Sequence, residues 1–149
     1  MLINRGDIYW VTLDSHIPHP YVILQDGLFN HSHLPTVVAC ALTTNHKRIS
    51  LPGNVALEAG EAGLLKRSFV EAGKIRSLQK NQLGPYIGTL TEARVVEILD
   101  GIRFLQRINP MSPAVKQVAQ LLCATPNFDI KRQFVLDDLC DRASYRFTL

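Results

Sequence analysis

The sequence predicts an α+β protein in which a small antiparallel β-barrel or sandwich is followed by helices. The first ninety residues contain about six short segments rich in β-branched and aromatic residues, separated by turns that hold Gly, Pro or Asn. From residue 91 onward, the apolar residues recur instead at the three- and four-residue spacing of helices. A length of 149 residues suits one domain, or one small domain with an appendage.

The predicted strands are short and end at turn residues. Ile8 and Trp10 alternate with Tyr9 and Val11, and because both sets are apolar, we expect this strand to be covered on two faces with Trp10 in the core. Further strands are predicted at residues 21–24, 36–42, 55–57, 68–72 and 86–88. Cys40 lies in the middle of an apolar run, so we interpret it as a core residue rather than a nucleophile.

A helix is predicted over residues 91–107. Thr91 is suited to cap its N-terminus, and an apolar stripe follows at helical spacing: Val95, Ile98, Leu99, Ile102 and Leu105. Gly101 lowers the intrinsic stability of this helix by about 1 kcal/mol relative to Ala, so packing must hold it. After Asn109 and Pro110, the pattern predicts a second amphipathic helix from Ser112 and a further short helix within 128–140.

Composition narrows the class of protein. Hydrophobic residues make up 46% of the chain, which argues against wholesale disorder. The net charge of +3 permits a nucleic-acid partner without arguing for one. Three cysteines without close spacing indicate reduced thiols in a cytosolic protein. Charged residues interrupt the first ten positions and no run of about 18 apolar residues exists, so we expect neither a signal peptide nor a membrane span.

A series of short motifs is more specific than any of these features. In order along the chain they are RGDIYWV at 5–11, PHPYVIL at 18–24, VVACALTTN at 37–45, PGNV at 52–55, KRS at 66–68, KIRSL at 74–78 and IGTL at 87–90. The ordered set resembles the MazF/PemK toxins, small sequence-selective endoribonucleases of type II toxin–antitoxin pairs. The resemblance covers about residues 3–108. It implies an SH3-like barrel domain with its C-terminal helix over 1–109. We expect 110–149 to be a helical extension packed on the barrel or dimer, with occupation of the groove as a built-in inhibitor as the alternative.

The resemblance also implies where RNA would be cut. Metal-independent cleavage needs a base at the 2′-hydroxyl, an acid at the departing 5′-oxygen and a group that steadies the phosphorane. The family carries an Arg that contacts the scissile phosphate at the position of His19, and Thr43 matches the Thr or Ser that completes the site. His19 either replaces the Arg as a titrating acid or base, or leaves a weak or inactive site. His16, in the preceding loop, is a further catalytic candidate.

Several other residues are candidates for RNA contact. Arg76 matches an Arg in the family's Gln-Ile-Arg-Thr segment, and would contact RNA, a second protomer or an acidic side chain. Asn45, Lys47 and Arg48 follow Thr43 closely, so the two cations would reach phosphates on the same face or form a solvated loop. His31 would line the RNA groove or lie in an exposed loop. His31 and His33 have no Cys or acidic residue at ligand spacing, so we predict no metal site.

The implied partners are single-stranded RNA, a cognate antitoxin protein and a second copy of the chain, with no cofactor, in the cytoplasm. Single-stranded RNA is readable because its bases can be splayed out. Two alternatives stay open. The first is a weak or inactive regulator that binds RNA or protein on the same scaffold. The second is a gyrase poison like the related CcdB toxins, which act through an exposed C-terminal helix end, whereas this chain continues to residue 149.

Overall fold

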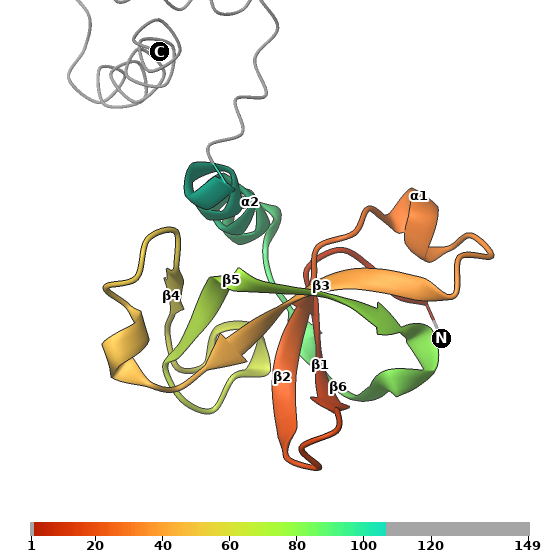
Figure 1. Ribbon diagram of the computed structural model, residues 1–149, viewed down its shortest axis with the longest axis horizontal. Helices are drawn as coiled ribbons and strands as arrows, with labels where there is room; N and C mark the ends of the chain where they lie inside the picture. Colours follow the sequence, from red (N-terminus) through yellow and green to blue (C-terminus); the bar gives the residue numbers. More distant parts are fainter. Residues whose placement is uncertain (1, 107–149) are drawn as a thin grey trace, which may run out of the picture. The chain divides into compact units, whose positions relative to one another are not determined.

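The computed structural model describes residues 2–106, which form a curled antiparallel sheet with a helix after its last strand (Figure 1). The strands are β1 (Asp7–Thr12), β2 (Pro18–Ile23), β3 (Thr36–Thr43), β4 (Val55–Leu57), β5 (Ser68–Gln79) and β6 (Leu83–Thr89). The helices are α1 (Gly27–Asn30), α2 (Glu92–Gln106) and the 3₁₀ turns η1 (His46–Arg48), η2 (Glu61–Gly63) and η3 (Lys80–Gln82). The predicted α+β barrel with a C-terminal helix is confirmed, and the helices predicted from Ser112 onward lie outside the described residues.

Neighbouring strands follow the order β4-β5-β3-β2-β1-β6, and every pair is antiparallel. The outer strands of the sheet are β4 and β6. The η2 turn, which follows β4 in the chain, lies against β6 and so connects the two edges. Gly88 permits this approach, because the Ala62 carbonyl oxygen occupies the space that a Cβ at position 88 would need. The sheet therefore curls into a small barrel, as the resemblance implied.

Alternate residues along the strands enter two hydrophobic clusters on opposite faces of the sheet. One cluster joins Ile8, Val22 and Cys40 to the α2 residues Val95 and Ile98. The other contains Tyr9, Val11, Tyr21, Val37, Ala39 and Leu78. The prediction that both faces of the first strand are covered is confirmed for these residues, and Cys40 is fully buried.

Trp10 corrects the sequence prediction, because 41% of its surface is exposed. Trp10 lies two residues after Ile8 in β1, so the alternation places it on the same face of the strand. It pairs with Pro20 of β2. Neither Trp10 nor Pro20 belongs to the cluster that buries Ile8. The apolar pattern located the strand correctly but did not reveal that the cluster on the Ile8 face does not include Trp10.

Helix α2 begins and packs as its sequence requires. The Thr91 hydroxyl accepts a hydrogen bond from the backbone N–H of Arg94 at 3.4 Å, so Thr91 caps the helix as predicted. Gly101 lies against the backbone of Gly53, whose φ of +81° is in the left-handed region. The Gly53 carbonyl oxygen occupies the place of a Cβ at position 101. Glycine at position 101 therefore lowers the intrinsic stability of the helix but allows close backbone contact with the turn at Gly53.

Two strands differ from their predicted lengths in ways that shape the site. β2 begins three residues earlier than expected and includes Pro18 and Pro20, which is tolerated because β3 pairs only with Tyr21–Ile23. β5 runs through to Gln79, beyond the predicted end at residue 72, so Arg76 lies inside the strand. The longer β5 is not regular, because its register with β3 shifts between Cys40 and Leu42.

We predict that Gly101→Ala destabilises the protein although it improves the helix propensity. The added Cβ would meet the Gly53 carbonyl, and overpacking of this kind lowers the free energy of unfolding by about 1–3 kcal/mol. Thermal and urea unfolding measure the change. The control Ala93→Gly, at an exposed position of α2, should cost about 1 kcal/mol through propensity alone. A higher melting temperature for Gly101→Ala would contradict the backbone contact.

Candidate functional site

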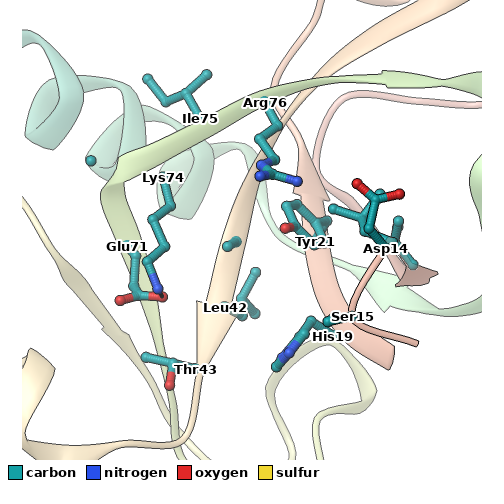
Figure 2. Close-up of a pocket in the computed structure, with 14 residues that line it drawn as sticks. Asp14, Ser15, His19, Tyr21, Leu42, Thr43, Glu71, Lys74, Ile75 and Arg76 are labelled. Atoms are coloured by element: carbon teal, nitrogen blue, oxygen red, sulfur yellow. Dashed lines mark ion pairs between the residues drawn. The ribbon is translucent and has the colours of Figure 1, made fainter. Parts of the chain in front are cut away.

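A cavity of about 540 Å³ opens where β2 and β3 separate. The last paired residues are Tyr21 and Ala41. If the same register continued for two more residues, His19 would pair with Thr43. The strands instead part at this point, and both side chains line the cavity (Figure 2). The end of a strand pairing therefore places an imidazole and a hydroxyl on opposite walls of one space.

The other side of the cavity is formed by the irregularity in β5. Cys40 pairs with Ile75 and Leu42 pairs with Val70, so four residues of β5 lie opposite Ala41 alone. This bulge holds Glu71 and Lys74, and both line the cavity. Bulges of this kind commonly redirect side chains beside active sites. The cavity is thus bordered by two interruptions of regular pairing, both at the same end of β3.

Thr43 is held in a defined position at the end of β3. Its Oγ1 accepts a hydrogen bond from the backbone N–H of Asn45 at 3.2 Å. The Asn45 side chain in turn caps η1 by accepting from the backbone N–H of Lys47 at 3.1 Å. Because the Thr43 oxygen acts as the acceptor in this contact, its own hydroxyl proton is available to donate to a ligand.

A buried carboxylate lies in the cavity wall. The Glu71 side chain is 7% exposed and pairs with the Lys74 ammonium at 3.2 Å and the Arg48 guanidinium at 3.7 Å. The Glu71 carbonyl accepts a hydrogen bond from the Cys40 thiol at 2.9 Å. Burial, with a smaller contribution from the Glu71 carboxylate, raises the pKa of Cys40 to about 12. This thiol is therefore a neutral core group and not a nucleophile.

The upper part of the cavity is polar and aromatic. Arg76 extends from β5 toward Tyr21, and Asp14 approaches from the loop between β1 and β2 (Figure 2). Tyr21 is only 7% exposed, so it forms part of the wall. The lining therefore offers His19, Lys74 and Arg76 to an anion, with the carboxylates of Asp14 and Glu71 beside them.

Three of the predicted site residues, His19, Thr43 and Arg76, are brought together here, and five are not among the cavity residues. His16 is exposed in the loop, with a φ of 57°. His31 lies elsewhere, with its Nε2 at 2.9 Å from the Ile3 carbonyl oxygen. Asn45, Lys47 and Arg48 belong to the η1 segment beside the cavity, and Arg48 approaches it through Glu71.

Sequence reasoning missed Glu71 and Lys74 as site residues. Glu71 falls near the end of the strand predicted at 68–72, and Lys74 lies just beyond it. A glycine and two charged residues inside an otherwise strand-like run are also a signal of a bulge. That signal would have kept Glu71 and Lys74 in the sheet, facing the same space as Thr43.

This lining suits a phosphate-bearing ligand. Lysine and arginine bind phosphate oxygens, a hydroxyl donates to them, and histidine exchanges protons near neutral pH. Within residues 2–106, no group of three or more His, Cys, Asp or Glu side chains is arranged to hold a metal ion. The fold and cavity together define a small curled-sheet protein with a polar groove suited to nucleic-acid phosphate.

Comparison with known proteins specifies the family. Residues 4–105 match the model of the PemK-like, MazF-like toxins of type II toxin–antitoxin systems. The chain belongs to this family. Endoribonuclease MazF6 of Mycobacterium tuberculosis is 32% identical over 109 residues, which cover 69% of this chain and 96% of that protein. Endoribonuclease MazF of Staphylococcus epidermidis is 29% identical over 103 residues, covering 65% and 85% respectively.

Solved structures agree with this assignment. An endoribonuclease from a mycobacterial species, in complex with its cognate antitoxin, superposes with a TM-score of 0.62 and 30% sequence identity, covering 72% of this chain and 99% of that one. The MazF of a MazE–MazF complex from Deinococcus radiodurans shares the fold, with a TM-score of 0.60 and 18% identity over 73% of this chain and 99% of that one.

None of the helices within residues 2–106 is long and apolar enough to cross a bilayer.

We predict that Cys40 resists alkylation in the folded protein. Its neutral thiol is buried and its pKa is raised to about 12 from an ordinary 9.0, so the reactive thiolate is scarce at pH 8. Iodoacetamide treatment followed by peptide mass spectrometry should leave Cys40 unmodified, and modify it fully in denaturant. Alkylation at the rate of a small thiol would contradict this environment.

The raised pKa of Cys40 also makes the stability of the protein depend on pH. The folded state holds the Cys40 proton more tightly than the unfolded state. The resulting contribution to the free energy of unfolding is therefore complete below about pH 9 and is lost as pH rises from 9 toward 12. The free energy of unfolding should fall over this range, and should fall less steeply in Cys40→Ala. An equal slope in both proteins would contradict the linkage.

Proposed function

We propose that this protein is a toxin of a type II toxin–antitoxin system that cleaves single-stranded RNA at a short sequence, without a metal ion. The observation that supports it best is the cavity at the β2–β3 separation, where His19 and Thr43 face each other beside cationic side chains. Family membership supports the same activity, since the relatives are named endoribonucleases.

The chemistry follows from the groups present. The 2′-hydroxyl loses its proton, and its oxygen attacks the adjacent phosphorus in line with the departing 5′-oxygen, which takes up a proton. The products are a 2′,3′-cyclic phosphate and a free 5′-hydroxyl. We assign removal of the 2′-hydroxyl proton to His19, while water supplies the proton that the departing 5′-oxygen takes up. Thr43, whose oxygen is already an acceptor for the Asn45 backbone N–H, donates a hydrogen bond to the phosphorane. Arg76 would hold a flanking part of the RNA strand.

The proposal extends to the partners of the protein. A structure 30% identical to this chain is a complex with a cognate antitoxin, so we propose that an antitoxin protein covers the RNA groove of this toxin. We also propose a homodimer, on the family resemblance, and a cytoplasmic site of action, where the RNA substrate is present. Size-exclusion chromatography with light scattering tests the dimer, and a monomeric mass at working concentration would reject it.

An RNA- or protein-binding regulator without cleavage is the second candidate. It is favoured by the exposure of His19, for whose ring no hydrogen-bond partner is found among residues 2–106. A histidine that is not held by a partner contributes less to catalysis than one whose position is fixed. The groove would then bind its ligand without cutting it.

Cleavage of a mixed single-stranded RNA in the presence of a chelator distinguishes these candidates. We expect wild-type protein to release fragments with cyclic-phosphate ends, identified by mass. His19→Ala should reduce the rate about 10²–10⁴-fold, as loss of an acid or base does, and Thr43→Ala about 10²–10³-fold, as loss of one donor does. His33→Ala and Thr44→Ala are matched controls at exposed positions that do not line the cavity.

Two outcomes would change the assignment. Loss of cleavage in chelator that is restored by a divalent metal would reject the metal-independent mechanism. Absence of cleavage under all conditions, with retained affinity for the RNA, would establish the binding candidate instead.

A further substitution tests the role of His19 directly. Arginine binds phosphate but does not release its proton at accessible pH, whereas histidine can transfer one. His19→Arg should therefore keep or increase RNA affinity while the single-turnover cleavage rate falls toward that of His19→Ala. A cleavage rate that is fully retained in His19→Arg would reject proton transfer by His19.

A further inference from the structure

We propose that Lys74 binds the phosphate at the cleavage position, and that Glu71 is a positioning residue that holds Lys74 there. This inference deepens the proposed function and rests on the groove being an RNA site. The observation that carries it is the β5 bulge, which directs Lys74 and Glu71 into the cavity that contains Thr43 and His19.

The register of the sheet selects Lys74 among the cations of the groove. Lys74 belongs to the bulge that lies opposite Ala41, two residues before Thr43. Arg76 instead pairs with Ala39, further from the end of β3, and extends toward Tyr21. In Figure 2 the Lys74 ammonium lies beside Glu71, on the side of the cavity where Thr43 is found. Lys74 is thus the cation next to the hydroxyl, and Arg76 is suited to an adjacent nucleotide.

The pairing with Glu71 leaves Lys74 able to bind a second anion. An ammonium carries three donors, and one of them is directed at the Glu71 carboxylate at 3.2 Å. The Lys74 side chain is 58% exposed, whereas Glu71 is 7% exposed. Glu71 therefore acts as a buried anchor, and the exposed ammonium keeps two donors for the cavity.

Arg48 makes this arrangement compatible with an anionic ligand. A lone carboxylate beside a bound phosphate would repel it, but the Glu71 carboxylate also faces Arg48 at 3.7 Å. The three groups together carry one net positive charge. The phosphorane formed during cleavage is more negative than the starting phosphate, so a cation held in advance stabilises it preferentially.

The first test measures phosphate binding without cleavage. A 2′-O-methyl RNA oligonucleotide cannot be cut by 2′-hydroxyl attack, so its affinity can be followed from low to high salt. The slope of log affinity against log salt decreases by about 0.7 for each phosphate of a single strand that the protein no longer neutralises. Lys74→Ala should show a decrease of about this size, and the exposed control Lys66→Ala, outside the cavity, should show none.

The second test uses cleavage of unmodified RNA in single-turnover experiments. Lys74→Ala should lower the rate about 10²–10³-fold, as removal of one transition-state donor does, and Lys74→Arg should recover part of it. Glu71→Gln should lower the rate with the salt slope unchanged, because Lys74 still binds phosphate but is no longer held beside Thr43. Melting temperatures of all variants identify any that fail to fold, and Lys74→Met repeats the test without the charge but with a similar stem.

The outcomes separate this inference from the proposed function. If wild-type protein cleaves RNA and Lys74→Ala retains both its rate and its salt slope, the role of Lys74 is overturned and the nuclease stands. If wild-type protein does not cleave but Lys74→Ala shows the smaller salt slope, Lys74 binds phosphate in a non-catalytic groove. A neutral methylphosphonate at the mapped cleavage position should abolish the affinity difference between Lys74→Ala and wild type; a difference that persists would place Lys74 at another phosphate.

Discussion

The site depends on the loss of regular pairing on both sides of β3 at its C-terminal end. On one side the ladder with β2 stops at Tyr21 and Ala41, and on the other side β5 bulges opposite Ala41. Antiparallel strands that stayed in register would bring His19 and Thr43 within side-chain contact and leave no cavity. His19 and Thr43 stand at the end of the β2–β3 ladder and Lys74 stands on the β5 bulge, whereas Arg76 lies in the regular part of β5 beside them.

The core and the groove are joined at the bulge. Cys40 enters the cluster packed against α2, and its thiol donates to the carbonyl of Glu71, whose carboxylate lines the cavity. A bulge leaves backbone groups without ladder partners, and burial makes an unpaired carbonyl costly. The Cys40 thiol donates to a carbonyl of the bulge from inside the core. The position of the groove cations is therefore supported by core packing as well as by ion pairs.

The sequence predicted the fold well because the fold depends on local patterns. The strand segments, the Thr91 cap and the stripe of α2 all follow from apolar spacing and turn residues, and Gly101 was expected to need packing. The site was predicted only in part. His19 and Thr43 followed from the ordered motifs, but Glu71 and Lys74 depend on a register shift between strands far apart in sequence. A local pattern can indicate a bulge there, but it does not give the strand partner or the space that the bulged side chains face. The exposure of Trp10 likewise depends on which residues pack beside it in the folded sheet.

Histidine and arginine at position 19 would supply different functions to the site. An arginine supplies a permanent charge and a rigid fork of donors, but it does not transfer protons. A histidine transfers protons and supplies a weaker, pH-dependent charge. Under the proposed function, the permanent cation beside His19 is therefore supplied by Lys74 of the β5 bulge, which is paired with a buried carboxylate. In this proposal, proton transfer belongs to β2 and phosphate binding belongs to β5.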